Sequence, residues 1–497
     1  MSVGMSRFRR GAGSPVVGRA LAAASVLLAT PACARGLDEG GSFDWGPVAA
    51  RYVDVNGERR LKGLGPFFES AVSPEGRRVW AFRPLYASAR DPESRRRVYD
   101  VAWPIAGGLR LGDERSFRFL TAFYRDFDVT EPKSRYHVRV WPVYFQGRDA
   151  QGRSYLGIFP LGGRIHEFLG RDEIAFFLFP LTMYSSINEV RSYEFLWPLI
   201  ARSEGKGIGR FRIAPFYGYA KHRDRFEKRF VLWPFWTWAR YKYPNASGRG
   251  YVVFPLWGHI KLQDQETWFV VPPLFRFSRG ARMNYSHYPW PLLQRSEGEV
   301  EKFYVWPLFG KKRMRGVRSS FFLWPIFRTE QVDRGDVVGR RFVAMPFIQS
   351  EVRKQRPREA GGTWRPVARC HKVWPLVSFR QEGEARRIRV LDLWPLWDSG
   401  PVERSWAPLW TVVSHVTVGE ATDDEILWGF FRHHRRGSGR RAVSLFPLFR
   451  WSRDDAAATR RWDVLMGLFG YERRGTQRAI RMLYFARFGA GKKESPP

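Results

Sequence analysis

Carboxylate side chains lie close together at three places in the sequence: Asp126 and Asp128, the run from 423 to 425, and Asp454 and Asp455. Two carboxyl groups can perform acid–base chemistry when they face each other across a substrate and their environments separate their pKa values. All three groups have arginines and turn-forming residues nearby, so turn formation and ion pairing explain them more simply. We therefore predict no catalytic carboxylates at these positions.

Asp392 is a more unusual acidic residue, because it stands three residues before Pro395 at a position that is often apolar in similar segments. A carboxylate in an otherwise apolar run needs a partner if it is buried. We expect Asp392 to line an interior or to pair with an arginine.

Histidine and cysteine, the other common chemical side chains, form no recognisable motif. Only His433 and His434 of the nine histidines are adjacent, and their arginine neighbours would compete with a metal ion. The sequence contains no H-E-x-x-H, no Cys-x-x-Cys, no phosphate-binding glycine loop and no G-x-S-x-G. We predict no enzymatic activity, no metal ligands and no cofactor.

Basic residues are in large excess, with 83 Lys and Arg against 48 Asp and Glu and a formal net charge of +35. This surplus favours anionic partners such as lipid headgroups, lipopolysaccharide or acidic glycan, although an arginine-rich composition that fills turns explains it equally well. Nucleic acid is not expected, because the aromatic and basic residues are not interleaved on one face. The candidate contact residues form three clusters: Arg95, Arg96 and Arg97; Lys311, Lys312, Arg313 and Arg315; and Arg435, Arg436, Arg440 and Arg441.

A repeated apolar segment of the type Trp-Pro-Leu-Phe organises the chain that carries these residues. Residues 230–238, Phe-Val-Leu-Trp-Pro-Phe-Trp-Thr-Trp, are a representative copy. Successive prolines are mostly 16 to 21 residues apart, and such a fixed period indicates a repeat architecture. The register prolines are Pro84, Pro104, Pro142, Pro160, Pro180, Pro198, Pro215, Pro234, Pro255, Pro273, Pro291, Pro307, Pro325, Pro346, Pro375, Pro395, Pro408 and Pro447.

Each copy is short, apolar and bounded by charged residues and glycine, which predicts a strand rather than a helix. With one strand of roughly ten residues per repeat, the fold class is all-β, an antiparallel meander of about twenty strands. A proline at the centre of every strand would require a shared crease, so we expect a curved or two-layered sheet. Both alternate faces of the copies are apolar, which predicts that the tryptophans are buried and stack across strands.

Two other architectures remain open. A transmembrane β-barrel would suit a run such as 482–488, but its strands should alternate apolar with polar residues and its loops should alternate in length. A β-solenoid with one coil per repeat would have to accommodate the uneven spacings.

The N-terminal residues 1–34 resemble an export signal. Arg7, Arg9 and Arg10 form a basic region, residues 20–29 an apolar region, and residues 32–34 a cleavage site of the Ala-x-Ala type. Cys33 allows a second interpretation as the lipid anchor of a bacterial lipoprotein, although the residues before it depart from that pattern. If the signal is removed, Cys370 is the only cysteine left and no internal disulfide can form.

The remaining divisions follow from composition. We expect a tether and an irregular first unit over 35–75, the repeat array over 76–488 and a disordered tail over 489–497. The wide gap between Pro346 and Pro375 predicts a longer loop or a seam between two halves near 347–366.

These features together predict a non-catalytic protein of a bacterial cell envelope, exported to the periplasm or outer membrane and associated with a membrane. Its expected role is structural, or binding toward anionic lipid, lipopolysaccharide or glycan. An outer-membrane barrel with a pore or transport role is the alternative.

Overall fold

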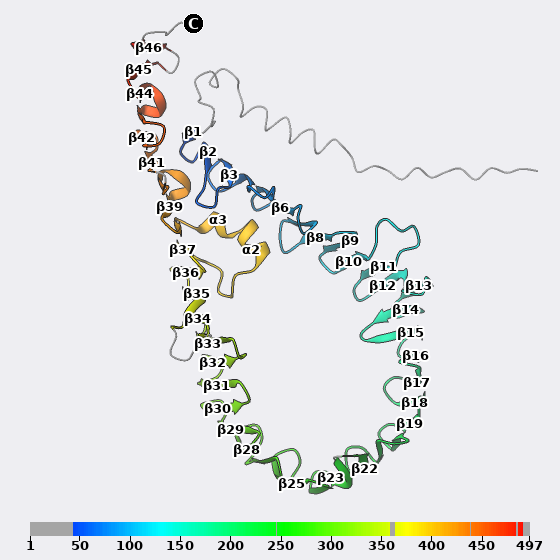
Figure 1. Ribbon diagram of the computed structural model, residues 1–497. Coiled ribbons are helices and arrows are strands. Elements are labelled where there is room, and N and C mark those ends of the chain that lie inside the picture. The colour runs from blue at the N-terminus through cyan, green and yellow to red at the C-terminus, as the bar shows by residue number, and fades with distance from the viewer. Residues whose placement is uncertain (1–42, 245, 358–362, 438, 484–485, 491–497) are drawn as a thin grey trace, which may run out of the picture.

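The chain forms one antiparallel sheet of 46 strands (Figure 1) in a computed structural model that describes residues 43–244, 246–357, 363–437, 439–483 and 486–490. Each strand pairs with the strands that precede and follow it in sequence, as β21 does with β20 and β22. The predicted all-β antiparallel meander is therefore confirmed. Antiparallel pairing throughout rules out the parallel solenoid.

The first half of the strands are β1 Phe43–Trp45, β2 Ala49–Val53, β3 Arg59–Gly63, β4 Phe68–Val72, β5 Arg78–Phe82, β6 Tyr86–Asp91, β7 Arg96–Val101, β8 Ala106–Leu111, β9 Glu114–Phe119, β10 Ala122–Asp126, β11 Tyr136–Val140, β12 Tyr144–Arg148, β13 Ser154–Ile158, β14 Gly162–Phe168, β15 Arg171–Phe177, β16 Thr182–Ile187, β17 Val190–Phe195, β18 Ile200–Gly205, β19 Ile208–Ile213, β20 Tyr217–His222, β21 Phe226–Val231, β22 Trp236–Tyr243 and β23 Ala246–Val253.

The second half are β24 Trp257–Leu262, β25 Gln265–Val270, β26 Phe275–Gly280, β27 Met283–His287, β28 Leu293–Gly298, β29 Val300–Val305, β30 Phe309–Met314, β31 Val317–Phe322, β32 Phe327–Asp333, β33 Val337–Ala344, β34 Ile348–Gln355, β35 Arg365–Val373, β36 Val377–Glu382, β37 Ala385–Val390, β38 Val413–Val418, β39 Ala421–Ile426, β40 Phe431–Arg435, β41 Arg441–Leu445, β42 Phe449–Asp454, β43 Thr459–Val464, β44 Phe469–Arg474, β45 Gln477–Met482 and β46 Ala486–Ala490. Two short helices, α2 Gly400–Ser405 and α3 Ala407–Trp410, lie between β37 and β38, and single turns of 3₁₀ helix occupy Leu427–Gly429 and Leu465–Gly467.

Except for Pro395 and Pro408, the register prolines lie in turns between strands, so the predicted mid-strand crease is wrong. In the turn from Leu178 to Leu181, the N–H of Leu181 donates to the carbonyl oxygen of Leu178 at 2.8 Å, and Pro180 is the third residue. The peptide bond before Pro180 is cis, which makes this a type VI turn. Every register proline except Pro395 and Pro408 follows a cis bond.

The expected number of strands is also wrong, because each repeat contains two strands rather than one. The apolar run 230–238 contains the end of β21, a tight turn and the start of β22. Since its apolar character continues through the turn, the sequence shows no break where the chain reverses. A four-residue turn with proline at its third position reverses the chain without needing an N–H from that residue.

Consecutive proline turns are hydrogen-bonded to one another. The N–H of Leu178 donates to the carbonyl oxygen of Leu161 at 2.7 Å, and the N–H of Leu196 donates to Leu181 at 2.7 Å. The residue just before the proline repeats this contact, as Trp197 N–H donates to Pro180 at 2.8 Å. The turns thus form a continuous row, and the sheet pairing extends through it.

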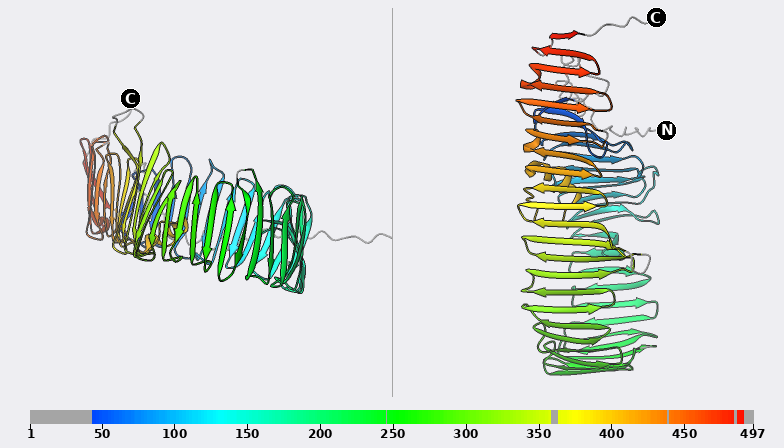
Figure 2. Two further views of the ribbon diagram at one scale, coloured as in Figure 1. Left: turned by 90° about the horizontal axis from the view of Figure 1, so that it is seen from below. Right: turned by 60° about the vertical axis from the view of Figure 1, so that its left-hand side comes forward.

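The sheet curves until its two ends overlap (Figure 1, Figure 2). Within the described residues β1 pairs with β2 alone and β46 with β45 alone, so the sheet is open and the closed-barrel alternative is wrong. The blue N-terminal strands lie beside the orange and yellow C-terminal strands, and β44 to β46 continue beyond this overlap. The curved sheet forms a wall, and we call the concave side of this wall its inner face.

Side chains, rather than backbone pairing, join the overlapping ends. Arg432 of β40 bonds Asp44 of β1 at 2.6 Å, and Lys62 of β3 forms an ion pair with Glu425 of β39. Because these residues meet across the curve, they lie on the inner face. We call this set of contacts the closure.

The helical segment adds a second bridge from the C-terminal part of the chain to the N-terminal strands. Arg404 of α2 bonds Asp100 of β7 at 2.8 Å, and the indole N–H of Trp406 donates to the carbonyl oxygen of Trp103 at 2.9 Å. Pro395 and Pro408, which are unusually close in the sequence, therefore belong to an insertion between β37 and β38 that contacts the N-terminal strands.

Several predicted boundaries change in the structure. Strands β1 to β4 lie within residues 43–72, so the sheet begins before residue 76. Strands β34 and β35 pair across the region of the expected seam, with a register shift between Arg353 and Lys354.

The export signal, Cys33 and the tail residues 491–497 lie outside the described residues. Cys370 is a free thiol. None of the described helices has the length and apolar character needed to span a bilayer.

Candidate functional site

One edge of the sheet is formed by apolar turns. Within the described residues, the connections that lead from an odd-numbered strand to the next even-numbered strand fall on this edge, since each repeat contributes two strands. Trp233 and Phe235, for example, are each 56% exposed. We call these exposed side chains the apolar rim; they include Trp141, Leu161, Phe177, Trp197, Phe216, Trp233, Phe235, Leu256, Trp290, Leu308, Trp324, Phe347, Leu376 and Leu448.

Aromatic rings of neighbouring turns contact one another along the rim. The ring centroids of Phe179 and Trp197 are 5.5 Å apart, and those of Trp306 and Trp324 are 5.9 Å apart. Such spacings are typical of aromatic pairs. The predicted contact between aromatic residues of adjacent repeats is confirmed. Their predicted burial is wrong, because every tryptophan that the structure describes is partly or fully exposed.

The opposite edge consists of polar and charged turns, and we call it the basic edge. All three predicted basic clusters lie at or beside it: Arg95 is in the turn before β7, Arg315 in the turn after β30, and Arg440 in the loop before β41. These three side chains are exposed. Strands of mostly six residues separate this edge from the apolar rim by roughly 20 Å, at about 3.3 Å per residue. The clusters are far from one another along the wall.

Most of the remaining basic residues of the three clusters lie in the strands next to those turns. Arg96 and Arg97 begin β7, Lys311, Lys312 and Arg313 lie in β30, and Arg435 and Arg441 face each other between β40 and β41. Arg436 differs, because it bonds Asp423 at 2.6 Å and donates to the carbonyl oxygen of Val53 at 2.6 Å. Arg436 therefore belongs to the closure and is not available as a free anion contact.

The acidic run 423–425 lies in strand β39, close to the turn that precedes it, and its predicted ion pairing is present. Asp423 bonds His434 at 2.7 Å, and Asp424 bonds His433 at 2.8 Å. Burial raises the pKa of Glu425, but Lys62 and Arg432 outweigh it and hold the pKa at about 2.

Asp392 is 3% exposed and pairs with Lys372 at 3.2 Å. It is therefore in an interior, as expected, but its partner is a lysine. Of the other acidic pairs, Asp126 accepts hydrogen bonds from Ser134 and Tyr124. Asp454 ends β42, and Asp455 begins the turn to β43. Among the residues that the structure describes, no group of three or more His, Cys, Asp or Glu side chains is placed to hold a metal ion.

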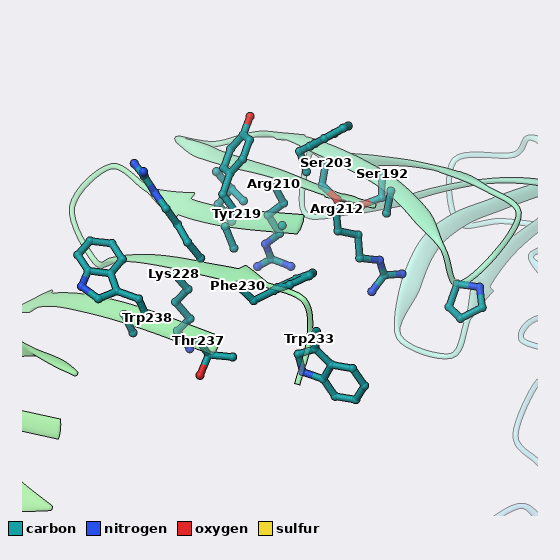
Figure 3. A pocket seen from close by; sticks show the side chains of 18 of the residues that line it. Ser192, Ser203, Arg210, Arg212, Tyr219, Lys228, Phe230, Trp233, Thr237 and Trp238 are labelled. Carbon is teal, nitrogen blue, oxygen red and sulfur yellow. Dashed lines mark hydrogen bonds between the residues drawn. The ribbon is translucent and has the colours of Figure 1, made fainter. Parts of the chain in front are cut away.

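The inner face of strands β17 to β24 encloses a hollow of about 980 Å³ where the wall bends (Figure 3). Arg210 and Arg212 extend from β19 on the same side of the sheet, whereas Tyr219 points away from them. Phe230 lies below both arginines in this view. The charged residues that line the hollow are Arg171, Arg210, Arg212, Lys228, Arg229 and Glu194.

Positive charge in the hollow is only partly compensated. Arg212 lies 3.6 Å from Glu194, yet neither the Arg212 Nε nor the Glu194 Oε2 has a hydrogen-bond partner. Within the described part of the chain, Arg210 makes no ion pair. Lys228 lies over the rings of Phe226 and Tyr241, at 5.2 and 5.3 Å from their centroids.

No protein family model matches this sequence, and no curated protein shows significant similarity to it.

Neither the exposure of the rim nor the hollow was predicted from the sequence. The pattern Arg210-Phe211-Arg212 places two arginines on one face of a strand, and this was the available signal for the hollow. Their grouping with Lys228 depends on the pairing register of β19, β20 and β21, which no single strand pattern encodes.

Proposed function

We propose that this protein is a non-catalytic β-repeat protein of a bacterial cell envelope that docks on a membrane through its apolar rim. The observation that carries the proposal is the row of exposed Trp, Phe and Leu side chains, which follows one edge of the sheet for nearly its whole length. Tryptophan and other amphipathic aromatic residues favour the boundary between water and lipid.

The distribution of charge supports lipid as the partner. Basic residues occur one position inside the rim ends of strands, as Arg118, Arg212 and Arg328 do. With the turns immersed by ~5–10 Å, a depth common for interfacial segments, these guanidinium groups lie near the level of the phosphates. Anionic headgroups would add an attraction of about 1 kcal/mol for each such basic residue.

The shape of the rim also favours a membrane over a protein partner. The rim is one turn wide and follows the long curve of the wall, so a protein partner would need a matching curved groove. A fluid lipid surface adapts to this line. The predicted export signal at residues 1–34 supports an envelope location, and the basic edge, ~20 Å from the rim, then faces away from this membrane. Lipopolysaccharide or acidic glycan are its proposed contacts.

Flotation of the purified protein with lipid vesicles tests the proposal. The rim variant replaces Leu308, Trp324, Phe347 and Leu376 by Ser, and a matched control variant replaces Leu111, Tyr243, Met314 and Val367, which are exposed near the basic edge. Vesicles of phosphatidylcholine are compared with vesicles that also contain phosphatidylglycerol.

The rim variant should bind vesicles at least about tenfold more weakly, because full burial of one large apolar side chain contributes ~1.5–3 kcal/mol. The control variant should bind like the unaltered protein, and phosphatidylglycerol should strengthen binding. The proposal is wrong if the rim variant floats normally. It is equally wrong if the unaltered protein does not float but self-associates through the rim, so that only the rim variant is monomeric.

A further inference from the structure

We infer that the hollow on the inner face of β17 to β24 binds an anionic amphiphile, with its charged head at Arg210, Arg212 and Lys228 and its apolar tail directed to the rim. This inference goes beyond membrane docking and relies on it only for the direction of the tail. Head binding can be tested without a membrane.

The arrangement of basic groups fits a phosphate or a similar oxyanion. Arg210 faces Ser203 across the β18–β19 pair and Ala220 across the β19–β20 pair, and Ala220 in turn faces Lys228 across the β20–β21 pair. Arg210 and Lys228 are thus two strands apart on one face. Planar guanidinium groups bind phosphate oxygens through two parallel hydrogen bonds, and lysine adds a point charge.

Unused hydrogen-bonding capacity supports an anionic ligand at this place. The Nε of Arg212 is buried without a partner, and Arg210 has no carboxylate partner within the described residues. The one acidic group of the lining, Glu194, is 3.6 Å from Arg212 and cannot also neutralise Arg210 and Lys228 through equally close contacts. An oxyanion would supply the missing acceptors.

The wall of the hollow becomes apolar toward the rim. Phe230 lies next to the basic group, and Trp197, Pro198 and Trp233 line the hollow at the turns themselves. A ligand with an apolar tail can therefore place its head among the arginines and extend its tail past Phe230 toward the rim. Free phosphate would leave this part of the lining unused, so the structure favours a membrane lipid.

Calorimetric titration with soluble short-chain lipids tests the inference. The probes are dihexanoyl phosphatidic acid, dihexanoyl phosphatidylcholine and inorganic phosphate. The variant Arg210→Gln with Lys228→Gln leaves the Arg212–Glu194 contact intact, and Arg202→Gln is the control, because Arg202 is exposed and pairs with Glu204 at 3.0 Å.

We expect phosphatidic acid to bind, phosphatidylcholine and phosphate to bind at least about tenfold more weakly, and the double variant to lose about tenfold or more in affinity for phosphatidic acid. Phosphate binding as tight as that of phosphatidic acid would identify an oxyanion site without a tail site and overturn the inference. Equal binding of phosphatidylcholine, or an unchanged double variant, would also overturn it.

Comparison with the flotation experiment separates this inference from the proposed function. The rim variant lacks no residue of the hollow, so it should retain phosphatidic acid binding while it loses vesicle binding. The double variant should float with phosphatidylcholine vesicles like the unaltered protein, while it loses phosphatidic acid binding. Failure of one experiment alone therefore identifies which of the two proposals is wrong.

Discussion

Arg432 and Asp44 are separated by 388 residues in the sequence, and their side chains form an ion pair of 2.6 Å. Arg432 is 1% exposed and also contacts Glu425 at 3.2 Å, so three charged groups from both ends of the sheet meet in one buried cluster. The curve of the wall is thus held by buried charge pairs, which depend on both partners being present.

Substitution of Arg432 by Gln should destabilise the closure, because the largely buried Asp44 would lose its cation and Glu425 would keep only Lys62. We expect a loss of about 3–5 kcal/mol in the free energy of unfolding measured with urea. Small-angle X-ray scattering should show a larger radius of gyration as the ends separate. Arg295→Gln, which removes an exposed pair with Glu297, should change stability by only about 0–1 kcal/mol. An unchanged radius for Arg432→Gln would argue against this account of the closure.

Acid should weaken the closure, and with it the neighbouring ion pairs of Glu69, in a defined pH range. Burial raises the pKa values of Glu69 and Glu425, but Arg83 and Arg60 for Glu69, and Lys62 and Arg432 for Glu425, outweigh it and hold both pKa values at about 2. Because the folded pKa values lie below the unfolded values, the stabilisation is present above about pH 4.5 and is lost as the pH falls toward 2. The free energy of unfolding should fall over this range, and less steeply in Glu425→Gln. Equal slopes in both proteins would contradict the prediction.

His137 should affect stability in a separate, higher pH range. The side chain is 5% exposed, its Nδ1 lies 2.7 Å from the Tyr155 hydroxyl, and burial together with Arg139 lowers its pKa to about 4. A folded pKa below the unfolded value of about 6.5 means that its contribution is present above pH 6.5 and is lost as the pH falls through 4. Titration of the imidazole by NMR should give a midpoint near 4. A midpoint near 6.5 would show that the ring is solvated.

Cys370 should react slowly with thiol reagents in the folded protein. Burial raises the pKa of its thiol, so the reactive thiolate is scarcer at neutral pH than in an exposed cysteine. Labelling with iodoacetamide at pH 7.5 should be several times slower than in urea-unfolded protein. Equal rates in the folded and unfolded protein would show an accessible thiol of ordinary pKa.

Substitutions of two arginines from the same sequence cluster should differ in their effect on the free energy of unfolding. Arg436→Gln removes the contacts with Asp423 and Val53 and should cost about 1–3 kcal/mol of stability. Arg441→Gln, at an exposed position five residues later, should change stability by less than about 0.5 kcal/mol. Urea unfolding of both variants checks this difference, and equal losses would show that Arg436 is not part of the closure.

Sequence patterns were sufficient for the fold class and insufficient for the strand count. The period of the proline segments and their apolar content identified an antiparallel meander. The chain reversal at residues such as Trp233-Pro234 was hidden, because apolar residues of two strands and their turn form one uninterrupted run. The same feature explains the wrong expectation of buried tryptophans, since a residue in a turn has neighbours on fewer sides than one in a strand centre.

The candidate sites depended even more on long-range structure. The basic clusters were visible as runs of Arg and Lys, but Arg436 could be assigned to the closure only once Val53 and Asp423 were placed beside it. The grouping of Arg210 with Lys228 arises from strand register over three strands. This register is set by the two hairpin connections between β19, β20 and β21, so no single strand segment contains it.

The pairing of two strands in each repeat bears on how such a protein can evolve. Duplication or loss of a whole repeat would lengthen or shorten the wall while every later Trp-Pro turn, such as Trp324-Pro325, kept its side of the molecule. Gain of a single strand would move every later Trp-Pro turn to the opposite side of the molecule. Recombination between repeats can therefore change the length of the curved sheet. The placement of apolar turns on one side and charged turns on the other stays the same.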